Sequence, residues 1–190
     1  CSSETLLELA RDRKYLGATP GIIQVLHTWG QTLNFHPHIH CIVSGGGLSV
    51  DQKLRRCGEK FFIPVRVMAK VFRGKFLCYL QKYYVTGKLV FSSSCAELRN
   101  SYSWNEFRDS LYKMDWCPYI KETFNGFGNA IEYLGRYTHR IAITNTRIQS
   151  VTDTHVSFAA RDYKSGETKT VTLENKEFIR RFLMHVLPSG

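Results

Sequence analysis

Apolar residues recur along this chain at two different periods, which predict helical and extended regions in turn. In residues 65–84 they recur every three or four positions with basic residues between them, which is typical of an amphipathic helix with an inward apolar stripe. Similar spacing, with Asn175 as a possible cap for the last segment, predicts further helices. These further helices are expected over residues 3–10, 103–114, 129–137 and 176–186.

Other segments are rich in β-branched and aromatic residues and are bounded by turn residues, which favours strands. The strands at 21–29 and 35–44 are separated by a short link, so we expect them to pair antiparallel, with Gly45–Gly47 forming the turn that ends the second strand. Pro118 marks one further strand as an edge or a bulge. The later strands are expected over residues 116–121, 141–151, 155–161 and 168–173.

Composition narrows the class of protein. The chain has 190 residues, enough for one sizeable core, and its 43% hydrophobic and 22% charged residues are ordinary for a globular protein. No segment approaches the roughly 20 apolar residues of a membrane span. The net charge of +10 favours a polyanionic partner, nucleic acid before an anionic membrane. The six cysteines form no CxxC pair, which favours reduced thiols in a cytoplasmic protein.

Three histidines alternate in one predicted strand, at His36, His38 and His40. Side chains alternate faces along a strand, so the three rings share one face, at spacings of roughly 6–7 Å. Two such imidazoles can bind one metal ion, but they do not complete a site. Gln31 is the preferred third ligand, and His36 and His27 are the alternatives.

The ligand types indicate which ion to expect. An amide-oxygen ligand and open water positions would suit Mg²⁺ or Mn²⁺. Two other His-x-His folds fit poorly. A cupin would place a glutamate where Ser44 stands, and a barrel amidohydrolase needs a longer chain. Gly45–Gly47 lacks the lysine and helix of a P-loop, so nucleotide binding is not expected.

Two tyrosines stand four residues apart, at Tyr133 and Tyr137, which places them on one face of the predicted helix. A pair of core aromatics would explain this spacing alone. The neighbouring Arg136, His139 and Arg140 suit phosphate contacts better than a buried stripe. Metal-binding histidines and paired tyrosines together predict attack of a tyrosine hydroxyl on a DNA phosphodiester, giving a 5′-phosphotyrosine and a free 3′-OH.

These segments resemble the HUH endonucleases, and within them the rolling-circle insertion-sequence transposases that carry two catalytic tyrosines. His38-Ile39-His40 matches the His-hydrophobe-His signature. The resemblance extends from about residue 5 to the end of the chain. It rests on five segments, residues 26–31, 36–40, 45–49, 133–140 and 178–188.

The resemblance implies an α+β fold with a central antiparallel RRM-like sheet flanked by helices. It implies one domain over 1–190, with a core at about 5–144 and a β-rich extension with a final helix at about 145–190. It also implies Mg²⁺ or Mn²⁺, and single-stranded DNA at transposon ends and target as the substrate. In this scheme His38 and His40 bind the metal, Tyr133 and Tyr137 cut and rejoin DNA, and further residues contact DNA. The expected DNA contacts are Arg136, His139, Arg140 and Lys121.

Two readings with other biology stay open at this point. A rolling-circle replication initiator or a relaxase would use the same chemistry on DNA. A non-catalytic DNA-binding module would use the positive charge of the chain to bind DNA but would not cut it. Members of the resembled family usually carry an N-terminal cysteine-rich zinc module, which has no counterpart in these residues. The chain also starts at Cys1 without an initiator Met, so we expect it to be a fragment of a longer protein.

Overall fold

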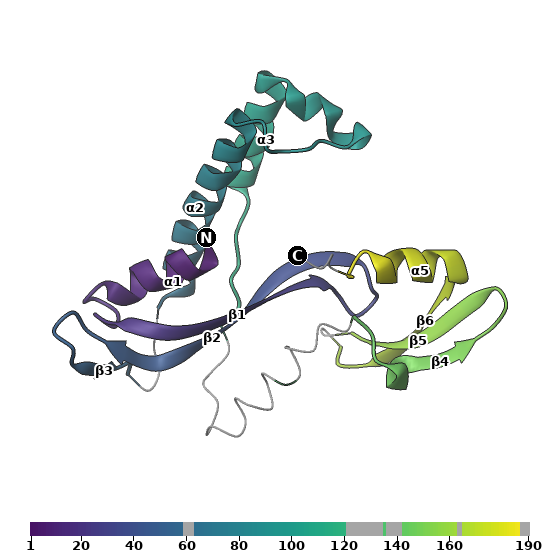
Figure 1. Cartoon of the computed structure of the whole chain (residues 1–190), viewed down its shortest axis with the longest axis horizontal. Coiled ribbons are helices and arrows are strands. Elements are labelled where there is room, and N and C mark those ends of the chain that lie inside the picture. The colour runs from purple at the N-terminus through teal and green to yellow at the C-terminus, as the bar shows by residue number, and fades with distance from the viewer. Residues whose placement is uncertain (59–62, 121–134, 136–141, 163–164, 187–190) are drawn as a thin grey trace. The chain divides into compact units, whose positions relative to one another are not determined.

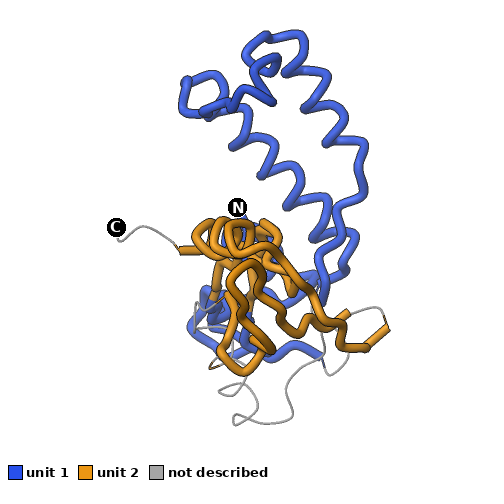
Figure 2. The backbone as a smooth tube through the Cα atoms, turned by 90° about the vertical axis from the view of Figure 1, so that its right-hand side faces the viewer, with its two compact units in different colours: residues 1–23, 42–123 blue, residues 24–41, 124–190 orange. Residues whose placement is uncertain are grey.

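The computed structural model describes residues 1–58, 63–120, 135, 142–162 and 165–186 (Figure 1). It confirms the α+β class, with antiparallel sheets and flanking helices. The chain divides into two compact units, residues 1–23 with 42–123 and residues 24–41 with 124–190 (Figure 2). Because strands β1 (Thr19–Trp29) and β2 (Phe35–Leu48) contribute to both units, the division does not follow the expected boundary near residue 144, and the single domain stays a prediction.

Helices dominate the first unit. Helix α1 (Ser2–Arg11) is joined to α2 (Val65–Val85) by an ion pair of 2.6 Å between Lys75 and Glu8 and by a hydrogen bond that Tyr79 donates to Glu4. The short η1 (Ser93–Arg99) precedes α3 (Ser101–Lys113). The predicted helices at 3–10, 65–84 and 103–114 are therefore confirmed within one or two residues.

The apolar stripe predicted for α2 packs against aromatic residues. Tyr84 stacks on the buried Trp104 of α3 with ring centroids 4.0 Å apart, and Phe76 contacts Trp116. Gln81 accepts a hydrogen bond of 2.7 Å from the indole nitrogen of Trp104. The indole therefore has a polar partner although its ring is buried.

The first sheet has the strand order β1-β2-β3, formed by β1 (Thr19–Trp29), β2 (Phe35–Leu48) and β3 (Leu54–Arg56). The prediction that Gly45–Gly47 ends the second strand is wrong. These glycines continue β2 and pair with β3, with Gly46 opposite Arg56 and Gly47 opposite Arg55. A Cβ on Gly46 or Gly47 would collide with the backbone of Arg55 or Thr19, so the strands approach too closely for any other residue.

Gly47→Ala is expected to destabilise the chain by about 3 kcal/mol, because the new methyl group would overlap the Thr19 carbonyl and neither strand can retreat without losing pairing. Gly74→Ala is the matched control. Nothing lies within 4 Å of its Cβ position in the interior of α2, so this change should stabilise by up to about 1 kcal/mol. Urea unfolding of both variants measures the difference. Equal stabilities would contradict the close approach.

The second unit contains the antiparallel meander β4-β5-β6, formed by β4 (Ile148–Val151), β5 (His155–Arg161) and β6 (Thr168–Glu174), and then helix α5 (Asn175–Leu183). A hydrophobic core lies beneath them, with Leu33 and Phe158 both fully buried. Its other members are Ala142 and Ile143, with Trp29, Ile148, Val171, Leu173 and Phe178 packed around them.

Three expectations for these regions are corrected. Residues 116–120 form no strand, which agrees with Pro118, because proline cannot donate a hydrogen bond to a neighbouring strand. The strand expected from 141 begins only at Ile148, because Ala142 and Ile143 turn into the core and η2 (Asn145–Arg147) follows. Asn175 does not cap α5 with its side chain, because its amide donates instead to the carbonyls of Thr152 and Asp153. In the helix predicted at 129–137 only Gly135 is described, and it is helical.

Candidate metal centre

Three histidines of the second unit meet on one face of the β1–β2 hairpin. His27 comes from β1, and His38 and His40 come from β2. One ring nitrogen of each lies within 4.8 Å of the others. Two bonds of about 2.1 Å to one ion span at most about 4.2 Å, so only a small inward movement would let all three bind it. The donor set therefore fits a divalent metal ion.

Hydrogen bonding selects the ligand atom of His38. Its Nδ1 lies 2.7 Å from the His36 carbonyl oxygen, and a carbonyl only accepts, so Nδ1 carries the proton and donates. The lone pair then lies on Nε2. A metal-binding histidine commonly donates its other nitrogen to a carbonyl in this way, which fixes both tautomer and ring orientation.

The local environment keeps two of the rings uncharged. Burial lowers the pKa of His40 to about 4, with a further contribution from the neighbouring His27 and His38. Burial also lowers the pKa of His38, although its bond to the His36 carbonyl opposes the shift. At neutral pH both imidazoles are therefore uncharged, which is the form that binds metal.

His27 is the most buried of the three, with 5% of its surface exposed, and its ring stacks on Trp29 at 4.7 Å. Its separation from His40 is also 4.7 Å between ring centroids. The eleven-residue interval between His27 and His38 spans a short loop, so the pairing of β1 with β2 brings them together. Sequence reasoning included His27 among the candidates but ranked Gln31 ahead of it.

The two other candidate ligands have different surroundings. His36 lies beside His38, with ring centroids 5.1 Å apart, and its carbonyl orients that ring. The Gln31 side-chain oxygen accepts a hydrogen bond of 3.3 Å from the backbone N–H of Arg161. Gln31 thus contacts the β-meander through the atom that would have to bind the metal.

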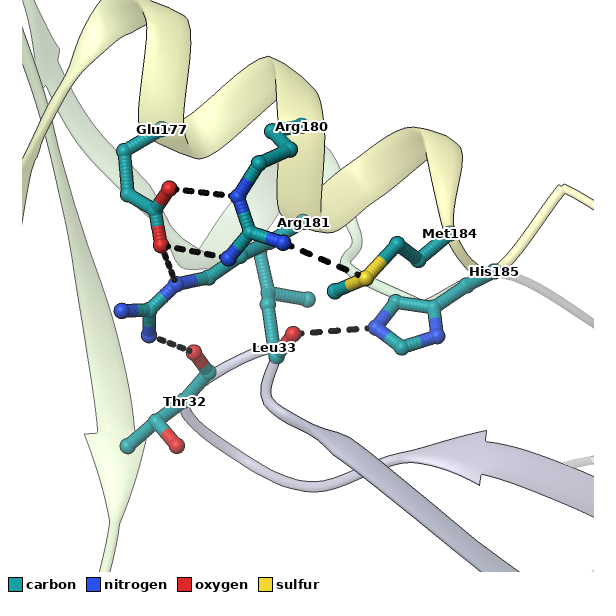
Figure 3. Close-up of polar contacts among 7 residues, drawn as sticks. All are labelled: Thr32, Leu33, Glu177, Arg180, Arg181, Met184 and His185. Carbon is teal, nitrogen blue, oxygen red and sulfur yellow. Dashed lines mark hydrogen bonds and ion pairs between the residues drawn. The ribbon is translucent and has the colours of Figure 1, made fainter. Parts of the chain in front are cut away.

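The loop between β1 and β2 is held by side chains from the C-terminal part of the chain. Three successive carbonyls of this loop each accept a hydrogen bond, Gln31 from Arg147, Thr32 from Arg181 and Leu33 from His185. Figure 3 shows the last two of these contacts, which come from α5 and the residues just after it. We call these three side chains the loop clamp.

His185 is the most buried member of the loop clamp, with 4% exposure. Its Nε2 donates to the Leu33 carbonyl at 2.9 Å, so its Nδ1 accepts from the Thr28 hydroxyl at 3.0 Å. Thr28 directly follows His27. Leu33 itself has a φ of 58° and is fully buried, so core packing holds it in a left-handed conformation that non-glycine residues rarely adopt.

A carboxylate orients one of the two arginines of the loop clamp, Arg181. Glu177 bonds Arg180 and Arg181 at 2.7 Å, with Arg181 turned toward Thr32 (Figure 3). Hydrogen bonds from Arg180 and then Arg181 lower the pKa of Glu177 to about 2. The carboxylate therefore stays ionised, and the arrangement persists, at any pH near neutrality.

The remaining predicted site residues lie outside the described residues. These are Tyr133, Tyr137, Arg136, His139, Arg140 and Lys121. Their roles in strand cleavage and DNA binding stay predictions. In the part of the chain that is described, no helix is long and apolar enough to cross a membrane.

Fold and site together define an α+β protein with a three-histidine cluster suited to a divalent ion. The chain belongs to the Y2_Tnp family, described as "Putative transposase", whose sequence model matches residues 21–190. No solved structure matches the chain.

Two curated relatives agree with this family. The chain is 44% identical to the "Putative transposase y4qJ" of Sinorhizobium fredii, over the whole of this chain and 48% of the relative. It is 24% identical to the "Transposase for insertion sequence element IS801" of Pseudomonas savastanoi pv. phaseolicola, over 96% of this chain and 45% of the relative. The chain thus spans about half the length of the curated relatives it matches.

Proposed function

We propose that this chain is the catalytic part of a transposase, which nicks and rejoins single-stranded DNA at transposon ends in rolling-circle transposition. The observation that carries the proposal is the convergence of His27, His38 and His40 in a chain that belongs to a transposase family. The net charge of +10 supports a nucleic-acid substrate. In this proposal the paired Tyr133 and Tyr137 supply the nucleophiles.

The three histidines would hold the ion, with His27 as the third ligand in place of Gln31. An all-imidazole donor set favours a transition metal, so among the two expected ions we propose Mn²⁺ over Mg²⁺. When bound, the ion supplies Lewis-acid stabilisation of the charge that develops on the phosphate oxygens. Trp29 packs against His27, and His36 orients His38, so both residues fix ligand positions before DNA binds.

The nucleophile in this proposal is the hydroxyl oxygen of Tyr133 or Tyr137. It forms a bond to phosphorus while the bond from phosphorus to the 3′ oxygen breaks, and the phenolic proton ends on the 3′ oxygen as a free 3′-OH. The phosphotyrosine ester retains the bond energy, so a later 3′-OH can reverse the reaction and join strands without ATP. Two tyrosines on one helix face would allow two such transfers in sequence.

A replication initiator or a relaxase would use the same chemistry, but membership of the transposase family favours transposition. A non-catalytic DNA-binding module has no need for three histidines that converge at one point. For a module that only binds DNA, the affinity would fall steeply with salt concentration and no covalent product would form.

The Tyr133→Phe/Tyr137→Phe double variant is expected to lose all covalent adduct with a labelled single-stranded transposon-end oligonucleotide in Mn²⁺, because phenylalanine has no nucleophilic oxygen. Denaturing electrophoresis measures the adduct, and EDTA should prevent it in the unsubstituted protein. Tyr119→Phe is the control, since this exposed tyrosine lies outside the predicted pair. An adduct that survives in the double variant would refute the tyrosine mechanism.

A further inference from the structure

We propose that a cluster of basic side chains in the first unit, distinct from the metal centre, binds the phosphate backbone of the DNA substrate. It lies where the end of α1 meets the start of β1 and strand β3. This inference rests on the proposed function, because it assumes that DNA is the substrate. We call the cluster the arginine surface, and its members are Arg11, Arg13, Lys14, Lys53 and Arg55.

A small core brings these segments together. Ala10, Leu16 and Ala18 are buried with one another, and Cys57, directly after β3, packs against them. The Cys57 amide also donates to the Gly45 carbonyl at 3.0 Å, which ties the end of β3 to β2. Arg13 and Arg55, on either side of this core, are therefore neighbours in space although some forty residues separate them in sequence.

Gly17 allows two of the arginines to approach each other. It has a φ of +65°, and the position where a Cβ would stand lies 2.8 Å from Nη1 of Arg55 and 3.5 Å from Cγ of Arg13. The Arg55 guanidinium thus rests on the turn after α1, beside the Arg13 side chain. Arg11 is fixed as well, since its Nε donates to the Thr19 hydroxyl at 3.2 Å.

The charge of the arginine surface is poorly balanced. Within the described residues, no carboxylate lies within ion-pair distance of Arg11, Arg13 or Arg55. Lys53 pairs with Asp51 at 3.7 Å, and a hydrogen bond from Ser49 is the main reason that the pKa of Asp51 is lowered, with Arg55 adding a smaller effect. Other cations do have acidic partners, as Lys75 has Glu8 and Arg181 has Glu177.

This arrangement is chemically suited to phosphodiesters. Arginine presents a planar fork of N–H donors that matches two phosphate oxygens, and it does not lose its charge at neutral pH. Placing like charges together costs energy in the free protein, and a bound polyanion relieves that repulsion. Backbone contacts of this kind position a nucleic acid without selecting its sequence. The arginine surface would thus add affinity and orientation, leaving chemistry to the metal centre.

The test compares two triple variants that remove the same charge from the same unit. Arg11→Gln/Arg13→Gln/Arg55→Gln removes three arginines of the arginine surface, and Arg66→Gln/Lys70→Gln/Lys82→Gln removes three exposed cations of α2. Fluorescence anisotropy measures the Kd for a labelled single-stranded oligonucleotide, and in parallel for a duplex, at salt concentrations from about 50 to about 200 mM. EDTA prevents cleavage during binding.

We expect the first variant to bind single-stranded DNA at least about tenfold more weakly, with a salt slope smaller by about 2, as loss of three phosphate contacts predicts. The α2 variant should stay within about twofold of the unsubstituted protein. Equal weakening in both variants would mean that only net charge matters, and unchanged binding in the first would also overturn the proposal. A larger loss on the duplex than on the single strand would assign the surface to flanking double-stranded DNA.

Two further measurements separate this inference from the proposed function. At saturating oligonucleotide with Mn²⁺, the first variant should still form the covalent adduct, because its metal centre is intact. If neither it nor the unsubstituted protein forms an adduct while DNA binding follows the expected pattern, the proposed function fails and the arginine surface stands. Arg11→Gln/Arg13→Gln, which retains the partly buried Arg55, should give an intermediate Kd and guards against a folding defect in the triple variant.

Discussion

Replacing His27 by alanine is expected to abolish metal-dependent cleavage and to lower Mn²⁺ affinity by more than about 100-fold. Loss of a residue that only supports a ligand typically costs 10- to 100-fold, and loss of the ligand itself should cost more. Isothermal titration calorimetry with Mn²⁺ measures the affinity, and the oligonucleotide assay measures cleavage. His27 lies with His38 and His40 within 4.8 Å, so its removal leaves two ligands.

Gln31→Ala is the discriminating control for this experiment. The change removes the side-chain oxygen that accepts from Arg161, but it keeps the backbone carbonyl that accepts from Arg147. We expect Mn²⁺ affinity to fall by less than about tenfold, since no ligand is lost. The opposite ranking, with His27→Ala tolerated and Gln31→Ala inactive, would restore Gln31 as the third ligand.

The second large effect is expected at His185. His185→Ala should destabilise the chain by about 3 kcal/mol, because it leaves two buried polar groups, the Thr28 hydroxyl and the Leu33 carbonyl, without their partner. It should also weaken Mn²⁺ binding by about 10- to 100-fold, since Thr28 and the loop after Trp29 position the hairpin that carries the ligands. Urea unfolding and calorimetry measure the two effects.

His155→Ala provides the comparison for His185. His155 is exposed on β5 and bonds only its neighbour Thr154 through the side chain, so its replacement should change stability by no more than about 0.5 kcal/mol. It should leave Mn²⁺ binding unchanged. If His185→Ala proves as mild as His155→Ala, the loop clamp does not support the metal centre.

Much of the fold could be predicted from the sequence, because the spacing of apolar residues in helices and strands is a local pattern. Helix α2 was predicted to within one residue, since its apolar stripe continues over five turns. The Gly45–Gly47 segment was misjudged for a physical reason. Glycine is common both in turns and where two backbones approach closely, and only the positions of Thr19 and Arg55 distinguish these two cases.

The candidate metal ligands likewise show which information is local in the sequence and which depends on distant residues. Alternation along one strand was enough to place His38 and His40 on one face. The third candidate ligand depends on which residue of the neighbouring strand stands opposite, and that register cannot be obtained from either strand alone. The loop clamp was beyond prediction, since its contacts with Thr28, Leu33 and Thr32 join residues about 150 positions apart.

The loop clamp also has a consequence for the order in which the protein is made. Ribosomes release His27, His38 and His40 early, but the side chains that hold the hairpin loop come at residues 147, 181 and 185. A nascent chain therefore carries these three histidines long before it can fix their geometry, and interactions between such distant residues form late in folding. We therefore expect the proposed metal centre to become complete only after the C-terminal residues have been made.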